Sequence, residues 1–130
     1  MEEKRIRIKA VIEILGSPKE HVENTMQLVA DKVKEGFSLL SCEIYDAEEI
    51  NGMWSSFADV EVNFKDIDQL IMFCFDFLPS SVEIIEPMNF NVKCTEMSNL
   101  INDLLARLHK YDMVVKQLNM ENTILKKKLN

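Results

Sequence analysis

The side chains that most often perform catalysis are few in this chain of 130 residues, and they lie far apart in the sequence. The two histidines, His21 and His109, stand alone and are expected on solvated helix surfaces. Ser80 and Ser81 follow a proline with no general base beside them. Three isolated glycines form no phosphate-binding loop. The sequence therefore predicts a protein that is not an enzyme and binds no cofactor.

Metal and disulfide chemistry find little support in the sequence. The three cysteines, Cys42, Cys74 and Cys94, form no Cys-x-x-Cys motif, and each is expected to be a small buried apolar side chain. The acidic run of Asp46, Glu48 and Glu49 lacks the glycine-centred spacing of a calcium loop. No metal site is expected.

Charge divides the chain into two parts. Residues 1–90 hold 8 Lys/Arg and 18 Asp/Glu, a balance of −10, whereas residues 91–130 hold 7 and 4, a balance of +3. An acidic body is repelled by phosphates, so nucleic acid is an unlikely partner. Lys126, Lys127 and Lys128 either complement a helix dipole or touch an anionic partner. No apolar run predicts a membrane span, and Met1–Arg5 does not resemble a signal peptide, so the cytoplasm is expected.

Residues 5–64 predict a strand, a helix and two further strands. Apolar residues alternate over 5–15, 40–44 and 58–64, as in half-buried strands. A helix is expected between Ser17 and Gly36, with Ser17 as its N-cap, Pro18 in the first turn and Glu20 closing a capping box. The connection over 46–56 carries Asn51-Gly52, a strong hairpin signal.

Residues 66–130 add two helices and a strand. Asp66 with Gln69 starts a helix that Pro79 ends, and 81–87 is a fourth strand with Val82 and Ile84 inward. The order predicts an α+β, ferredoxin-like βαββαβ sandwich over 1–87, with strand order 4-1-3-2. Residues 88–94 are a linker or a short edge strand at Phe90–Val92, and 95–130 form a long C-terminal helix.

A basic stripe on the first strand has two readings. Arg5, Arg7 and Lys9 are expected opposite Asp59 and Glu61 of the third strand, which favours cross-strand pairing. The alternative, an RNA-binding surface, would need exposed aromatic residues in the middle of the sheet.

The C-terminal helix carries a heptad seam sustained over about five repeats, which predicts a coiled coil. From Cys94 onward, the β-branched Ile101 and Val115 are at a positions and leucine occupies most d positions; β-branched residues at a with leucine at d favour two strands. The expected dimer seam comprises Met97, Ile101, Leu104, Leu108, Tyr111, Val115, Leu118, Asn122, Leu125 and Leu129.

Asn122 favours a parallel homodimer, since a buried amide is best tolerated opposite its own copy. The charges at the g and e positions also favour a parallel dimer, because Arg107 would face Asp112 of the partner and Glu121 would face Lys126 of the partner, and both pairs are opposite in sign. Folding back onto its own domain, or antiparallel pairing, is the alternative. Apolar Leu100 and Leu105 at g and e indicate that the start of this helix also packs on a domain or a larger assembly.

Two segments are candidates for partner binding. Ile50, Met53 and Trp54 surround the hairpin turn, where apolar residues are not needed; they either bind a partner or fold back. The helix over 66–78 is apolar nearly all round, with Met72, Phe73, Phe75 and Phe77 added to its core face. Either the start of the C-terminal helix covers it, or Phe73 and Phe77 line a groove for a partner protein.

Three stretches, Ser17–Glu23, Cys74–Glu83 and Asn102–His109, together resemble a family of small archaeal proteins of unknown function. The resemblance implies no activity and no site residues. The residues themselves favour a non-catalytic, homodimeric protein-interaction module. The alternative is a small-molecule-sensing regulatory domain with a ligand near the dimer interface, although the turn at Leu15–Pro18 has no second glycine to admit one. A zipper-type DNA binder is excluded, because no basic helix precedes the seam.

Overall fold

The computed structural model describes residues 5–130, and the chain divides into two compact units between Phe90 and Asn91. This boundary lies inside the segment 88–94 expected to be a linker. No strand forms at Phe90–Val92, so the alternative of an edge strand there is wrong.

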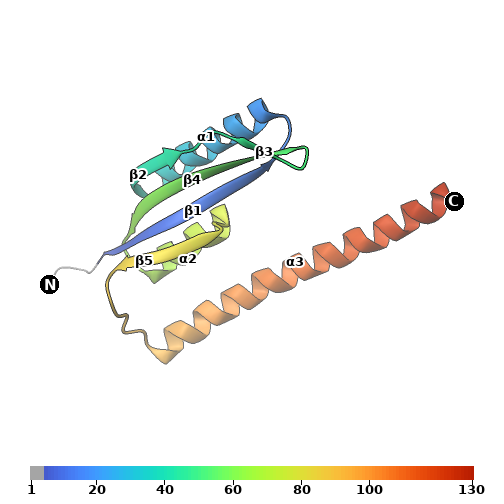
Figure 1. Cartoon of the computed structure of the whole chain (residues 1–130). Coiled ribbons are helices and arrows are strands. Elements are labelled where there is room, and N and C mark those ends of the chain that lie inside the picture. The colour runs from blue at the N-terminus through green and yellow to red at the C-terminus, as the bar shows by residue number, and fades with distance from the viewer. Residues whose placement is uncertain (1–4) are drawn as a thin grey trace. The chain divides into compact units, whose positions relative to one another are not determined.

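The first unit contains a mixed α+β fold, and the second contains a long helix (Figure 1). The elements of the first unit are β1 (Ile6–Gly16), α1 (Lys19–Gly36), β2 (Ser38–Ile44), β3 (Glu48–Ile50), β4 (Met53–Phe64), α2 (Ile67–Phe77) and β5 (Ser81–Glu86). The helix of the second unit is α3 (Cys94–Leu129).

The strands form one antiparallel sheet in the order β2-β4-β1-β5, with the short β3 also paired to β4. Strand β1 pairs with β4 over its full length, from Ile6 opposite Phe64 to Gly16 opposite Trp54. The predicted α+β class and the long C-terminal helix are confirmed. The fifth strand, β3, was not expected from the sequence.

Both helices of the first unit pack on one face of the sheet, and they share its core. Side chains at alternate positions of β1 and β4 meet α1 and α2, as their period-two pattern requires. Burial of these apolar side chains is the main force that holds the layers together. The buried cluster comprises Ile6, Ile8, Ala10, Ile12, Met26, Val33, Ala58, Val60, Val62, Phe64, Leu70 and Phe73.

The two helix starts differ in how well the sequence predicts them. Helix α2 begins as expected: Asp66 accepts a hydrogen bond from the Gln69 amide at 2.8 Å, and the Gln69 side chain accepts one from the Lys65 amide at 2.8 Å. The Ser17 cap of α1 is wrong. Pro18 occupies the N-cap position with no side-chain cap, and its carbonyl accepts the hydrogen bond of the Val22 amide.

The hairpin predicted at Asn51-Gly52 is confirmed. Both residues have positive φ, 52° and 80°, which is the geometry of a two-residue type I′ turn. The turn joins β3 to β4, so β4 begins at Met53 rather than near residue 58.

The edge strand β5 is less covered than its pattern predicts. Val82 and Ile84 pair with Ala10 and Ile8 and so face the helix side, yet they are 39% and 42% exposed. Helix α2 packs on β1 and β4 and leaves the outer strand at the margin of the core.

Candidate interaction surfaces

Helix α3 presents an apolar stripe with no partner inside its own unit. It has 36 residues, about 54 Å at the usual rise, and none of them is buried. Leu104 is the least exposed of the seam leucines at 41%, and Leu125 is 59% exposed. Ten seam side chains therefore lie along one helix, where a second helix can cover them.

Polar groups beside the seam make contacts within the helix. Lys116 forms an ion pair with Asp112 at 2.8 Å, and the Gln117 amide donates to Glu121 at 3.4 Å. Asp112 and Glu121 are the e and g carboxylates expected to pair between copies. An interchain pair must compete with these contacts, so such pairs select an orientation only weakly.

The predicted cluster at the hairpin turn divides between the two faces of the sheet. Ile50 and Met53 are cross-strand neighbours, 47% and 42% exposed. Trp54, one residue later, points to the opposite face and is half-buried, with the Lys19 ammonium 5.2 Å from its ring centroid. Because successive residues of a strand face opposite sides of the sheet, Ile50 and Met53 form one surface and Trp54 belongs to another.

The aromatic residues of α2 serve the core. Phe73 is completely buried, which contradicts its assignment to a partner groove, and Phe77 packs against the same core. Their rings lie 5.4 Å apart, and each lies within 6.0 Å of the Phe37 ring. Only Met72 on this helix, at 53%, and the C-cap residue Leu78, at 66%, have exposed large apolar side chains here. The sequence missed Phe37, which supplies the third ring.

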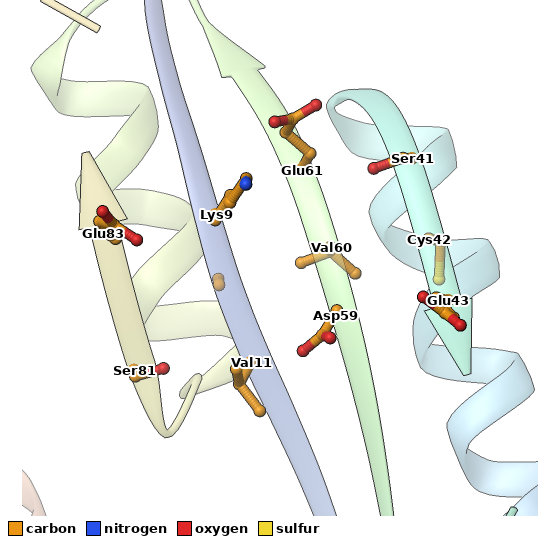
Figure 2. Close-up of a pocket in the computed structure, with 11 residues that line it drawn as sticks. Lys9, Val11, Ser41, Cys42, Glu43, Asp59, Val60, Glu61, Ser81 and Glu83 are labelled. Carbon is orange, nitrogen blue, oxygen red and sulfur yellow. The ribbon is translucent and has the colours of Figure 1, made fainter. Parts of the chain in front are cut away.

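The sheet face opposite the helices holds a shallow cavity of about 420 Å³ (Figure 2). Register places its side chains in two rows across four strands. One row runs Glu83, Lys9, Glu61 and Ser41; the other runs Ser81, Val11, Asp59 and Glu43. Ser41 and Ser81 lie at diagonally opposite corners of this arrangement, and their small side chains leave room for the cavity. Four carboxylates surround the single ammonium group of Lys9.

The predicted basic stripe is only partly confirmed. Lys9 lies opposite Glu61, but Asp59 faces Val11, and Arg7 forms an ion pair with Glu86 of β5 at 3.4 Å. Lys9 also lies opposite Glu83. The stripe therefore gives one cross-strand ion pair, Arg7 with Glu86, and places Lys9 opposite two carboxylates of an acidic surface, which favours the first of the two readings.

A tyrosine borders the cavity. The Tyr45 hydroxyl donates a 2.8 Å hydrogen bond to Asp59, and this bond, with the charge of that carboxylate, raises the pKa of Tyr45 to about 12. The bond orients the Asp59 carboxylate beside the cavity. The sequence alone does not predict this hydrogen bond, because the bond depends on the pairing of β2 with β4.

The cysteines differ from expectation. Cys42 and Cys94 are exposed, and Cys74 is half-buried, where burial raises the pKa of its thiol. Cys42 lies on an edge strand, and Cys94 is the first residue of α3. His21 and His109 are exposed, as expected. Within residues 5–130, no three His, Cys, Asp or Glu side chains gather into a metal site.

None of the helices described is long and apolar enough to cross a membrane.

Comparison with known proteins identifies a family but no function. The chain is 29% identical over 104 residues to "Uncharacterized protein MJ0538" of Methanocaldococcus jannaschii, and this alignment covers 78% of the chain but 38% of the relative. The chain thus spans well under half the length of that curated protein. No solved structure matches the chain. The model of the MJ0538 family matches residues 4–129, and the chain belongs to this family, in agreement with the archaeal resemblance noted in its sequence.

Proposed function

We propose that the chain is a non-catalytic protein-interaction module that forms a parallel homodimer through α3. The observation that carries the proposal is the exposed heptad seam, which has no cover within its own unit. Fully burying a leucine or valine side chain is worth about 1.5–3 kcal/mol. A second copy of α3 supplies the complementary surface at every layer, because the same a and d residues face one another in register.

The parallel direction rests on Asn122. Its side chain is exposed and forms no hydrogen bond with other described residues, so its amide remains available to the same residue of a partner. In an antiparallel pair the amide would instead meet apolar side chains, at a cost of about 1–3 kcal/mol for each unsatisfied group.

The head of each protomer is interpreted as a ferredoxin-like domain. The βαββαβ order and the sheet order β2-β4-β1-β5 support this reading, with β3 as an addition in the β2–β4 connection. The alternative function, a small-molecule sensor, has less support. Gly16 is the single glycine of the β1–α1 turn, and a β-carbon added there would lie in contact with the Val22 side chain, at 3.4 Å.

Light scattering tests the oligomeric state. One chain has a mass of 15.1 kDa, so a dimer is expected at twice that value. A chain without residues 91–130 should scatter as a monomer, provided that circular dichroism shows it folded. A full-length monomer at micromolar concentration would contradict the proposal.

Oxidative cross-linking tests the direction. With Cys42→Ser and Cys74→Ser, only Cys94 remains, at the first a layer. In a parallel pair the two Cys94 residues are neighbours, whereas in an antiparallel pair they lie about 50 Å apart along the 36-residue helix. Diamide should therefore give a covalent dimer. The matched control moves the cysteine to the outward f position, as Cys94→Ser with Ala106→Cys, and should not cross-link.

A further inference from the structure

The sheet face opposite the helices, here called the outer face, has no covering layer among the described residues of the first unit. Alternate side chains of β1 and β4 project from it, while their neighbours enter the core. At the end near the hairpin turn this face carries large apolar side chains, with the exposed carboxylates of Glu13 and Glu48 among them. Five large side chains there are between 39% and 56% exposed: Leu15, Tyr45, Ile50, Met53 and Phe57.

The middle of the outer face is acidic and hollow. The cavity of about 420 Å³ follows directly on Phe57, since Asp59 and Glu61 are the next outward residues of β4. Glu61 and Glu83 flank Lys9 on its two sides and form no ion pair with other described residues, and Glu43 lies beyond Asp59 (Figure 2). Across the four strands the cavity spans about 14 Å.

We propose that the outer face binds a basic amphipathic segment of a partner protein, with apolar side chains on the apolar end and Lys or Arg in the cavity. This inference rests on the proposed function as an interaction module and names the partner's chemistry. Ammonium and guanidinium groups donate hydrogen bonds to carboxylates, and a segment of four or five extended residues spans the cavity.

Other occupants fit the outer face less well. Phosphates of a nucleic acid would meet four carboxylates against one ammonium group. A second outer face carries the same excess of carboxylates and would be repelled. An apolar partner would leave Glu61 and Glu83 without compensation, at the cost of their desolvation.

The probe is a fluorescent eight-residue peptide with leucine and phenylalanine at one end and arginine and lysine at the other, titrated with full-length protein by anisotropy. Glu61→Gln with Glu83→Gln should weaken binding up to about tenfold, since two exposed charge pairs are lost. The control, Glu23→Gln with Glu35→Gln on α1, changes the net charge equally and should change binding less than about twofold. Phe57→Ser should weaken binding, whereas Leu28→Ser, also at an exposed site, should not.

Three results would overturn the inference: no binding to the unchanged protein, equal weakening by the face and control variants, or equal binding of a peptide whose basic residues are replaced by glutamate. Thermal melts establish that each variant is folded. Light scattering of the same samples separates the two proposals, because a normal dimer without peptide binding refutes only the outer-face site, and a monomer that binds the peptide refutes only the dimer.

Discussion

Leu108→Asp is the most direct test of the α3 seam. Leu108 is at an a position near the middle of the helix and is 52% exposed in the single chain. If full burial is worth about 1.5–3 kcal/mol, the remaining half is worth roughly 0.8–1.6 kcal/mol in each copy, or about 1.5–3 kcal/mol in the dimer.

Aspartate adds a second penalty. Two carboxylates would face each other in the seam, and desolvation with like-charge repulsion adds a few kcal/mol more. The sum is at least about 3 kcal/mol, which raises the dissociation constant of the dimer more than roughly 100-fold.

The matched control is Met113→Asp on the same helix. Met113 is at an outward f position and is 60% exposed, so the change costs the same helix propensity without touching the seam. Sedimentation equilibrium over a range of concentrations measures the dissociation constant of the dimer for each of the two variants. A dimer that tolerates Leu108→Asp as well as Met113→Asp would refute the assignment of the seam.

Three further predictions concern the seam, the core and the border of the cavity. Asn122→Ile should raise the melting temperature while mixing oligomeric states, because a polar a residue costs stability and specifies the pairing; native mass spectrometry showing one unchanged species with an unchanged melting point would contradict burial of this side chain. Phe73→Ala should cost about 3–5 kcal/mol in urea unfolding, since Phe73 is completely buried, whereas Met72→Ala, at an exposed site, should cost under about 0.5 kcal/mol. The hydrogen bond to Asp59 raises the pKa of Tyr45 to about 12, so the neutral hydroxyl stabilises the fold at pH values below the ordinary tyrosine pKa of about 10. This stabilisation should be lost as the pH rises through 12. Tyr45→Phe should remove that part of the pH dependence, and identical urea midpoints for both proteins across this range would show that the bond does not form in solution.

Local signals predicted the elements well where the contacts that stabilise them are also local. Asp66 and Gln69 lie three residues apart and cap the same helix end, and Asn51-Gly52 determines its own turn. The Ser17 cap was wrong because α1 begins one residue later: Pro18 is at the N-cap position, its carbonyl accepts the first intrahelical hydrogen bond from the Val22 amide, and no side chain caps the helix.

The candidate site was less predictable, because apolar side chains of one helix can be alike in the sequence and yet differ in whether another element buries them. Phe73 and Met72 are neighbours on one apolar helix, and only the packing of α2 on β1 and β4 buries the first and exposes the second. The cavity on the outer face was missed altogether. Its carboxylates come from three strands, and only pairing register brings Glu83, Glu61 and Glu43 to one surface.

The sequence by itself determined the kinds of element, their order, the uneven charge and the heptad seam of α3, since periodicity, capping and turn chemistry act over a few residues. The tertiary structure decided which apolar faces are covered, that Lys9 lies between Glu61 and Glu83, and that Trp54 and Met53 face opposite sides of the sheet. These properties depend on pairing between residues far apart in the sequence, such as Lys9 and Glu83, for which no short stretch of sequence holds the information.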